Sequence, residues 1–387
     1  MASHMMDAAS DKDVSTHPAD APWPAKGISP RCRSELSSTE RTQLDELAFK
    51  YGSQPESYDI LISAGSYLMT PCGNGVVSIL PHRHVWHIPG GLLAPDDLKP
   101  RMLEWLKRIA AENRRTIAFY CVGPRDVQYF RDLKFEINKL GEEPYVDLGS
   151  VTWQGKDFEW VRRQTNFCQR AGLEVVEISD DASKHALADE LVEILHEDLK
   201  WRTYSHPLCL LEGEFDPRNL YRRRLFLARH QETNRVEGFL ACSPLRDGRG
   251  WAFETYRKRS DAPRGTVPYL FRKVIDQLQD EKVEEVSLCL VPGKGVAEDP
   301  YTEGHWLSKL ALSMWYKRLN FLFNTQGQNY FKSRFRPRYI DRYICVTPVT
   351  TALSISSFLY KSGAYSPNLF NILRNLWGSW RQKVPQD

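Results

Sequence analysis

A carboxylate and a guanidinium lie three residues apart where a strand pattern gives way to a helix pattern. Glu254 and Arg257 belong to residues 251–270, in which alternating residues predict a strand and Gly265 precedes a run at helical spacing. A strand that ends in a glycine turn and opens a helix presents free backbone N–H groups, which suit a phosphate. Glu254 could hold an ammonium group or assist proton removal, and Arg257 could bind an anion.

The residues after this turn have the features of a helix start. Thr266 is a candidate N-cap, and Pro268 falls in the first turn, where a missing backbone N–H is tolerated. Apolar residues then recur at helical spacing, at Leu270, Phe271, Val274, Ile275 and Leu278. The alternative is an ordinary connection between a strand and a helix, in which Glu254 and Arg257 form an ion pair that closes the strand end.

A second stretch, residues 323–343, interleaves basic and aromatic side chains. On an extended segment one face would carry the cations and the other the aromatic residues. The cations are Lys332, Arg334, Arg336 and Arg338, and the aromatic residues are Phe331, Phe335 and Tyr339. Such closely spaced cations repel one another unless an anion such as an RNA backbone lies against them. A solvated strand face is the alternative.

Three histidines, His82, His84 and His87, have a spacing that could converge on one metal ion if the segment bent. In a strand, however, His82 and His84 share one face and His87 takes the other. No nearby cysteine or carboxylate completes a ligand set, so we expect no metal site here.

Three consecutive arginines, Arg222, Arg223 and Arg224, precede a predicted strand. A solvated basic corner is the expected result, and contact with RNA is the alternative. Tyr204 and His206 follow a long predicted helix and could line the acceptor side of a site, with core packing or a loop role as the alternative.

The composition limits the class of protein. The 387 residues suggest two or so domains, and 42% hydrophobic with 12% aromatic residues describe a globular protein. No apolar run approaches the roughly 18–20 residues needed to cross a bilayer. A net charge of +3 does not indicate nucleic acid by itself, so a basic surface must be local. Eight cysteines without a CxxC pair indicate reduced thiols in a cytoplasmic protein, and peripheral contact with a membrane stays open.

The order of predicted elements indicates two α/β units. We assign residues 1–38 to a tag remnant and a disordered tail, 39–172 to a first domain, 173–348 to a second and 349–387 to a helical tail. The first unit has helices over 38–52, 95–113, 126–133 and 156–170 and strands over 58–62, 66–70, 75–80, 84–88, 116–122 and 145–148. The second has strands over 174–178, 224–229, 235–244 and 286–291 and a helix over 181–202. It also contains the strand that begins at 251 and the helix that follows Gly265. The similar order suggests a duplicated fold.

The last predicted helix, residues 368–383, is amphipathic. Its apolar face carries Leu369, Ile372, Leu373, Leu376 and Trp380. It fits a helix docked on its own domain or on a second subunit, and also an interfacial helix at an anionic membrane.

Three segments carry a resemblance to a known family. They are residues 119–148 with the following 155–172 (FYCVGPRDVQYFRDLKFEINKLGEEPYVDL and GKDFEWVRRQTNFCQRAG), residues 254–271 (ETYRKRSDAPRGTVPYLF) and residues 323–344 (FNTQGQNYFKSRFRPRYIDRYI). Together they resemble the soluble catalytic domain of MprF-type phosphatidylglycerol lysyltransferases, which aminoacylate lipids from aminoacyl-tRNA. The likeness covers about residues 51–346.

The resemblance implies an α/β (α+β) fold class: tandem GNAT-type acyltransferase folds, mixed central sheets flanked by helices, and an active site in the second fold. An amino acid would move from aminoacyl-tRNA, a co-substrate used with no other cofactor and no metal, to a hydroxyl of a lipid acceptor at the membrane surface. The implied catalytic residues are Glu254, Arg257 and Lys332, those for tRNA or phosphate are Arg264, Gly265, Arg334 and Arg336, and those for substrate are Tyr204, His206, Tyr256 and Asn324.

The chain departs from the family pattern at two positions. The family usually has aspartate where this chain has Glu254, and often an acidic residue near Pro268, where this chain has none. The second departure leaves the bound amino acid open. The N-terminal flippase region of membrane-embedded members is absent from the sequence, so the chain is either an excised domain or, as we expect, a freestanding member. Its acceptor would be phosphatidylglycerol or another membrane lipid such as a sterol.

Two other functions stay open on the sequence. One is a GNAT enzyme that moves an acyl group from acyl-coenzyme A to a small amine, although the loop at 262–265 lacks the usual succession of glycines for pyrophosphate. The other is a non-catalytic module that binds tRNA or a membrane, because a fold can lose its activity and keep its surfaces.

Overall fold

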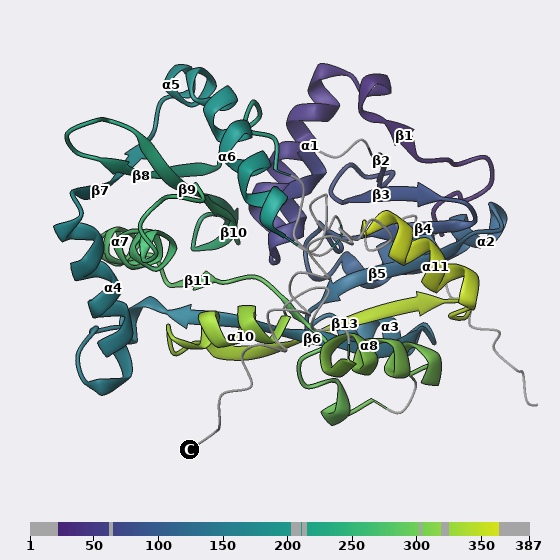
Figure 1. The fold of residues 1–387 in the computed structure, drawn as a ribbon. Coiled ribbons are helices and arrows are strands. Elements are labelled where there is room, and N and C mark those ends of the chain that lie inside the picture. The colour runs from purple at the N-terminus through teal and green to yellow at the C-terminus, as the bar shows by residue number, and fades with distance from the viewer. Residues whose placement is uncertain are drawn as a thin grey trace, which may run out of the picture.

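A mixed sheet of thirteen strands runs through the described part of the chain, which we analyse in a computed structural model (Figure 1). The structure describes residues 22–61, 65–202, 210, 215–301, 304–318 and 325–363. The strand order is β1-β2-β3-β4-β5-β13-β6-β11-β10-β9-β8-β7, and β12 pairs with β6 beside this path. The strands are β1 (Arg31–Cys32), β2 (Ser66–Met69), β3 (Val76–His82), β4 (Val85–Ile88), β5 (Thr116–Val122), β6 (Glu136–Asp147), β7 (Leu173–Ile178), β8 (Arg224–His230), β9 (Val236–Leu245), β10 (Gly250–Lys258), β11 (Glu285–Ser287), β12 (Val291–Pro292) and β13 (Arg338–Thr347).

Helices cover both faces of this sheet (Figure 1). They are α1 (Ser38–Tyr51), α2 (Lys99–Glu112), α3 (Val127–Asp132), α4 (Glu159–Arg170), α5 (Asp181–Ala186), α6 (Ala188–Trp201), α7 (Thr266–Asp280), α8 (Trp306–Arg318), α10 (Thr325–Ser333) and α11 (Ala352–Lys361), with a 3-10 helix η3 (Pro55–Leu61). Within the described residues, no helix is both long enough and apolar enough to cross a membrane.

One arrangement occurs twice along the chain. In the first repeat, β3 and β4 form an antiparallel hairpin, α2 crosses over, and β5 pairs with β4 in parallel. In the second repeat, β9 and β10 form the hairpin, α7 crosses over, and β11 pairs with β10 in parallel. The predicted mixed α/β class with flanking helices is therefore confirmed, and the similar element order corresponds to repeated topology.

The two repeats share strands at the centre of the sheet. β13, the last strand in the sequence, lies between β5 and β6 and pairs antiparallel with both. β6 in turn pairs with β11 of the second repeat. Residues on both sides of the predicted boundary at 172 thus contribute to one sheet, and the boundary itself stays a prediction.

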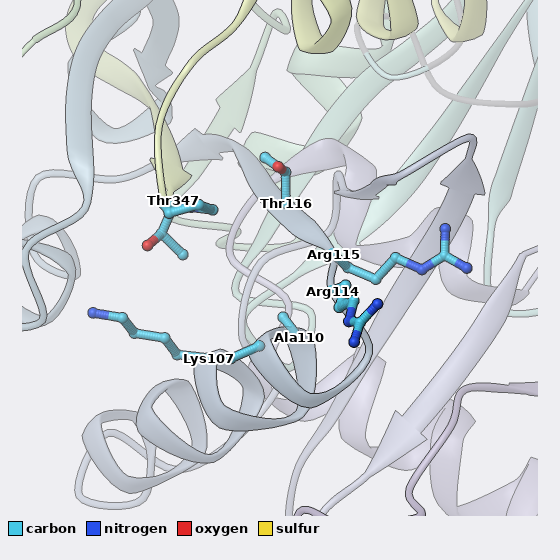
Figure 2. A pocket seen from close by; sticks show the side chains of 8 residues that line it. Lys107, Ala110, Arg114, Arg115, Thr116 and Thr347 are labelled. Carbon is cyan, nitrogen blue, oxygen red and sulfur yellow. The ribbon is translucent and has the colours of Figure 1, made fainter.

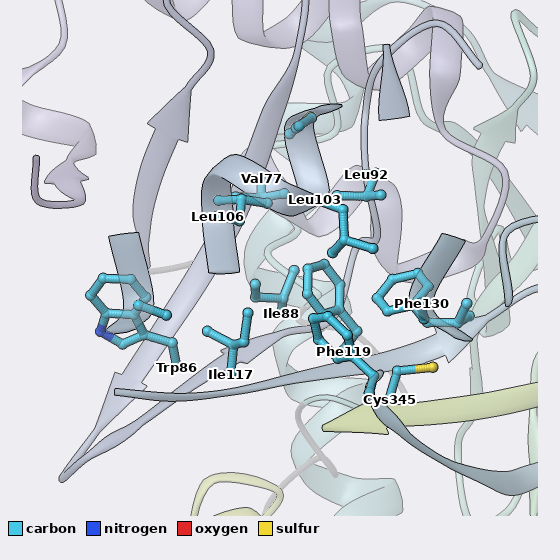
Figure 3. Packing of buried hydrophobic residues seen from close by; sticks show 14 of the residues in the cluster. Val77, Trp86, Ile88, Leu92, Leu103, Leu106, Ile117, Phe119, Phe130 and Cys345 are labelled. Carbon is cyan, nitrogen blue, oxygen red and sulfur yellow. The ribbon is translucent and has the colours of Figure 1, made fainter. Parts of the chain in front are cut away.

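Each repeat has its own apolar core. In the first, α2 packs on β3, β4 and β5 through side chains that include Leu103, Leu106, Ile117 and Phe119 (Figure 3). In the second, α7 and α4 pack on β8, β9 and β10, with Phe271 at the centre of several ring contacts. The helical spacing in α7 predicted this face, because residues three and four apart point the same way.

Most predicted elements are confirmed, and five predictions are wrong. The helix expected over 181–202 is divided into α5 and α6, and the strand expected over 286–291 is divided into β11 and β12. Of the strand predicted over 58–62, the described residues 58–61 do not form a strand, because η3 occupies Pro55–Leu61. β6 begins at Glu136, well before the predicted 145, since its charged residues hide the strand pattern. Residues 323–343 are not one extended segment, because α10 occupies Thr325–Ser333 before β13 begins. The predicted tail helix at 368–383 lies outside the described residues.

Candidate active site

The second repeat opens where β10 parts from β11. The two strands pair only over residues 250–252 and 285–287, while β10 continues along β9 to Lys258. A register shift between Phe253 and Thr255 leaves Glu254 as an extra residue opposite β9. Such a bulge re-aims a side chain, and the bulged residue is the carboxylate that the sequence singled out.

Glu254 has two buried partners. Arg223, just before β8, places Nη2 3.2 Å from Glu254 Oε1, and both side chains are 1% exposed. Ser243 on β9 donates its hydroxyl to Glu254 Oε2 and accepts a hydrogen bond from Arg223 Nε at 3.0 Å. A buried ion pair adds little net stability, because both ions lose their water. We therefore treat this pair as candidate binding machinery.

Lys332 reaches the same opening from α10. Its ammonium donates hydrogen bonds to the backbone oxygens of Cys289 and Leu290, at 3.0 and 3.1 Å. The Cys289 thiol donates to the carbonyl oxygen of Phe253, at 3.4 Å. Burial raises the pKa of this thiol, which also feels the charges of Lys332 and Glu254. Lys332 and Phe253, the neighbour of Glu254, thus contact one segment between β11 and β12.

A second buried ion pair joins β6 to β13. Arg342 donates through Nε to Glu143 and through Nη2 to the hydroxyl of Tyr145, at 2.8 Å. Ser287 on β11 donates to the other oxygen of Glu143. The carboxylate on β6 is therefore held by side chains of two other strands, β13 and β11, the second of which lies at the opening.

Glu56 on η3 lies close enough to both pairs to feel their charges. It is 2% exposed, and no described residue donates a hydrogen bond to its Oε2. Burial, and then the charge of Glu143, raises the pKa of Glu56 to about 8. Glu56 is therefore mostly protonated at neutral pH. We define the buried charge cluster as Glu56, Glu143, Arg223, Glu254 and Arg342.

Arg257 pairs with a different element. Its Nε lies 3.3 Å from Asp198 Oδ2 on α6, and its Nη1 donates to the backbone oxygen of Tyr256 at 2.8 Å. Glu254 and Arg257 thus have separate partners. The ion pair between them, which the sequence left open, does not form.

A cavity of about 280 Å³ lies at the start of α7, where the two chemically interesting stretches of sequence meet. Five elements or turns contribute to its wall: α4, β10, the turn before α7, the start of α7, and α10. The lining residues are Trp160, Tyr256, Lys258, Arg264, Val267, Pro268 and Phe331. The Phe331 ring is 6.1 Å from Tyr256 and 6.3 Å from Trp160. We call this the aromatic–cationic cavity, because ring faces and cations together suit a nucleotide.

The turn into α7 offers few backbone donors for a phosphate. The Thr266 N–H donates to Pro263 O at 3.0 Å, the Gly265 N–H faces the Cys168 thiol, and Pro268 has no N–H. Thr266 is not the predicted N-cap, because Gly265 holds that position and the Thr266 hydroxyl donates to Pro263 O. An anion at this turn would depend mainly on side chains.

Gly265 is required for packing and not for a left-handed turn. Its φ is −91°. A Cβ there would lie 3.0 Å from both Cys168 Sγ and Gln164 Oε1 of α4. The glycine therefore allows α4 to approach the start of α7 closely.

The predicted cations separate into two kinds. Arg264 is exposed and lies over the Phe167 ring at 5.5 Å, and Arg334 lies over Tyr330 at 4.2 Å. Neither arginine has a carboxylate within ion-pair distance among the described residues. Arg336 pairs with Asp157 at 2.7 Å, and Arg338 pairs with Glu285. The free cations are thus near the aromatic–cationic cavity.

Residues 46–346 match the family described as "Phosphatidylglycerol lysyltransferase, C-terminal". The chain belongs to this family. It is similar to a phosphatidylglycerol lysyltransferase of Bacillus subtilis (strain 168), with 23% identity over 260 residues, 67% of this chain and 29% of the relative. A second one, from Staphylococcus xylosus, is 18% identical over 314 residues, 81% of this chain and 36% of the relative. The chain therefore spans about a third of these relatives.

Two solved structures show that the phosphatidylglycerol lysyltransferase C-terminal fold is shared. One is the C-terminal domain (DUF2156) of a putative lysylphosphatidylglycerol synthetase from Agrobacterium fabrum, with a TM-score of 0.69 at 17% identity, covering 85% of this chain and 96% of that one. The other is L-PGS from Bacillus licheniformis, with a TM-score of 0.69 at 17% identity, covering 84% and 97%.

In this family member the arginine run is not a solvated basic corner, so that prediction is wrong. Arg222 pairs with Glu46, and Arg224 pairs with Glu177 at 2.6 Å. Arg223 is 2% exposed and belongs to the buried charge cluster. Sequence reasoning missed its role, because three like residues in a row give no signal of which one turns inward.

The histidines also differ from the prediction. His82 and His87 do not point to opposite faces, because β3 ends at His82 and the hairpin brings both rings to one partner. His82 Nδ1 and His87 Nε2 each lie 2.8 Å from the Ser357 hydroxyl on α11. Burial lowers the pKa of His87 to about 3, so this ring is neutral. The pair fastens α11 to the first repeat.

A further cavity, of about 370 Å³, lies at the end of α2 and is basic (Figure 2). Lys107 points away from Arg114 and Arg115, so the cations do not converge. Lys107 donates to Leu133 O at 2.5 Å, and Arg115 donates to Arg83 O. These contacts give Lys107 and Arg115 a structural role.

Three predicted substrate residues, Tyr204, His206 and Asn324, lie outside the described residues.

Proposed function

We propose that the protein transfers an amino acid from aminoacyl-tRNA to a hydroxyl group of a membrane lipid. One observation carries the proposal: β10 supplies both Glu254 of the buried charge cluster and two walls of the aromatic–cationic cavity, Tyr256 and Lys258. In the proposal, a nucleotide lies in the cavity and its aminoacyl end is directed along β10 towards the cluster. The similarity to phosphatidylglycerol lysyltransferases supports the same reaction class.

The cavity would bind the terminal adenosine of the tRNA. Bases stack on aromatic side chains with about 1–3 kcal/mol each, and Trp160, Tyr256 and Phe331 provide such faces. Arg264 and Arg334 lie over aromatic rings and would contact the last phosphates. Gly265 would contribute by letting α4 pack closely against the start of α7. Of the residues predicted to bind tRNA or phosphate, it is therefore the one with the least support for a direct contact.

The reaction would exchange one ester for another. The acceptor oxygen bonds to the aminoacyl carbonyl carbon, the bond from that carbon to the ribose oxygen breaks, and the acceptor proton ends on the ribose oxygen. An activated ester needs mainly positioning and stabilisation of charge. Glu254 would bind the α-ammonium group or take up the proton. Lys332 would stabilise the developing oxyanion through its field and by holding residues 289–290 in place. Arg257 would orient the substrate from the side of α6.

The first test is transfer of label from charged tRNA to lipid. The full chain is mixed with vesicles that contain phosphatidylglycerol or a sterol and with tRNA charged with a labelled amino acid, beginning with lysine. We expect label in the lipid fraction with charged tRNA and none with free amino acid. Retention of tRNA without transfer for every amino acid and lipid would support a binding module instead. A thermal shift with acetyl-coenzyme A and none with tRNA would support an acyl-coenzyme A enzyme.

A further inference from the structure

Glu56 is the one carboxylate of the buried charge cluster that has no ion-pair partner among the described residues. Arg223 lies 3.2 Å from Glu254, and Arg342 donates to Glu143. Glu56 is equally buried, at 2% exposed, yet no described cation lies within ion-pair distance of it. Burying a carboxylate is unfavourable unless a cation and hydrogen bonds compensate for the lost water. The cluster thus provides one more carboxylate than it has arginines to pair with.

The oxygen atoms of the three carboxylates show the same difference. Both oxygens of Glu254 and both oxygens of Glu143 accept hydrogen bonds from arginine and serine side chains. For Glu56 Oε2, the part of the chain that the structure describes offers no donor. Because an unpaired buried acceptor is unfavourable, this oxygen is suited to receive a donor from a ligand.

The position of η3 brings Glu56 from the first half of the chain to the second repeat. The Ser57 hydroxyl donates to the carbonyl oxygen of Gly90 at 2.9 Å, which fastens η3 to the loop after β4. On its other side, η3 contacts β9, the strand that carries Ser243. Glu56 therefore lies between the closed repeat and the open one.

The Cys289 thiol shows that Glu56 acts on the opening itself. Burial raises the pKa of this thiol, the charge of Lys332 lowers it, and the charges of Glu143, Glu56 and Glu254 raise it. Cys289 lies in the segment between β11 and β12 whose backbone oxygens accept hydrogen bonds from Lys332. Glu56 is thus within electrostatic reach of the segment where the proposed chemistry takes place.

In the free protein, a proton on Glu56 takes the place of a cation. Burial and then the charge of Glu143 raise the pKa of Glu56 to about 8, while the charge of Arg342 lowers it and that of Glu254 raises it. The Cys121 thiol on β5 also faces Glu56, because burial and then the charge of Glu56 raise the pKa of this thiol. A cation that entered beside Glu56 would favour its ionised form.

The donor substrate of the proposed reaction carries such a cation. An aminoacyl ester has its α-amino group on the carbon next to the reacting carbonyl, and an α-amino group is protonated at neutral pH, with a pKa of about 7.7–8.0. A hydrogen bond from an ammonium group to a carboxylate is short and strong. A carboxylate that binds this group also positions the ester for attack.

We infer that Glu56 is a substrate-binding residue that receives the α-ammonium group of the aminoacyl end and loses its own proton when this group enters. The O–H bond of the carboxyl group breaks, the proton passes to solvent, and the carboxylate accepts a hydrogen bond from the ammonium. The inference rests on the proposed function, because it needs an aminoacyl donor in the open repeat. Of the two roles proposed for Glu254, uptake of the acceptor proton then remains.

Two stable forms of charged tRNA test the inference. Both end in 3′-amino-3′-deoxyadenosine, so that an amide replaces the ester. One carries an alanyl group, and the other carries a propanoyl group, which lacks only the α-amino group. Binding of each form to the full chain is measured between about pH 6 and 7.5, and the readout is the ratio of the two dissociation constants. Contacts with the RNA cancel in this ratio, and so do differences in the fraction of folded protein.

Wild type should prefer the alanyl form by roughly tenfold or more at about pH 7.5, because hydrogen bonds between charged groups are the strong ones. The preference should shrink as pH falls, by up to about tenfold per pH unit, until it disappears. The reason is that the proton of Glu56 must leave before the ammonium group binds, and below its pKa this carboxyl group is mostly protonated.

Three variants complete the test. Glu56→Gln should bind the two forms nearly alike at every pH, and it should fold because glutamine has the size of protonated glutamate. Glu56→Asp keeps a carboxylate and should restore part of the preference. Gln54→Met is the matched control, because Gln54 lies just before η3, is 5% exposed and also has a buried oxygen without a donor among the described residues. The control should keep the preference of wild type and its dependence on pH.

The outcomes separate this inference from the proposed function. A wild-type preference in Glu56→Gln, or an equal loss of preference in Gln54→Met, would overturn the inference. Equal binding of the two forms by wild type at every pH would also overturn it, and labelled lipid in the transfer assay would then leave the proposed function standing. If neither form binds and no label is transferred, the proposed function fails and the inference fails with it.

Discussion

The two repeats have the same topology, but one is closed and the other is open. In the first, β4 and β5 pair in parallel over residues 85–88 and 116–119, and every residue of β5 is buried. Leu103, Leu106 and Phe119 fill the space beneath α2 (Figure 3). In the second, the parallel pairing ends after Ala252, and charged residues occupy the opening. A hairpin, a helix and a parallel strand can therefore form either a core or a site, depending on where the pairing stops.

The bulge in β10 makes the difference. Without the extra residue, Glu254 would follow the alternation of the strand. With it, the carboxylate meets Arg223 and Ser243. The surrounding strands then provide Glu143 and Arg342, which come from parts of the chain far apart in sequence.

The largest effect is expected from Glu254→Gln. Transfer should fall by roughly 100-fold or more, because a charge that stabilises the transition state is lost. Stability should fall by about 1–3 kcal/mol, since Arg223 remains buried without its countercharge. The matched control is Glu237→Gln, a carboxylate with a side chain 7% exposed that pairs with Arg235 at 3.1 Å. Turnover and urea unfolding of both variants provide the comparison, and equal turnover would remove Glu254 from the chemistry.

Replacing Lys332 by methionine should have the next largest effect. Two backbone oxygens lose their donor, so we expect about 1–3 kcal/mol less stability and roughly 100-fold slower transfer. Lys99→Met is the control in the first repeat, because Lys99 is also buried and pairs with Asp126 at 3.0 Å. Kinetic assays at a temperature where both variants are folded decide the matter. Wild-type turnover in Lys332→Met would make this lysine a purely structural residue.

The charge cluster should also make stability depend on pH. The pKa of Glu56 is raised to about 8, against about 4.3 in an unfolded chain. The folded protein therefore holds an extra proton between these values, and this glutamate makes stability fall as pH rises, by up to about 1.4 kcal/mol per pH unit. Below about pH 4.3 Glu56 is protonated in both the folded and the unfolded protein, so it no longer makes stability depend on pH. Burial is the largest cause of the raised pKa of Glu56, and the charges of Glu143 and Glu254, which raise it, and of Arg342, which lowers it, act on the same group.

Glu56→Gln should remove this dependence. Urea unfolding of wild type and variant between about pH 5 and 8 should show that the variant gains stability relative to wild type as pH rises. Parallel curves would mean that Glu56 is ionised in the folded protein.

The smallest effect is expected from Arg264→Ala. The side chain is exposed, so stability should not change measurably. Its loss should weaken the affinity for aminoacyl-tRNA several-fold and reduce the dependence on salt by about one ion. Arg218→Ala serves as the control, because Arg218 is exposed and pairs with Asp189 at 2.7 Å. Tests of binding at several salt concentrations would contradict the prediction if the two variants behaved alike.

Local patterns were enough to find the strand, turn and helix around Glu254. Period-two alternation and helical spacing depend only on neighbours in sequence. The partners of Glu254 could not be found in this way. Arg223 reaches Glu254 because β8 and β10 both pair with β9, and Arg342 reaches Glu143 because β13 inserts between β5 and β6.

The role of the basic–aromatic stretch was predicted in part. Phe331 does line a cavity with Tyr256 and Arg264. The stretch begins as a helix, however, so Lys332 is buried while Arg334 lies beside aromatic rings. A periodicity assigned to a strand cannot place residues of a helix, because the two have different repeat angles.

The central claim is that the aminoacyl end of tRNA enters the open repeat and not the closed one. Photochemical cross-linking from a tRNA that carries azidoadenosine at its terminal position tests this claim most directly. We predict cross-links to Trp160, Tyr256 or Phe331, which line the aromatic–cationic cavity. Cross-links confined to the first repeat, such as the basic cavity at Arg114 and Arg115, would contradict it.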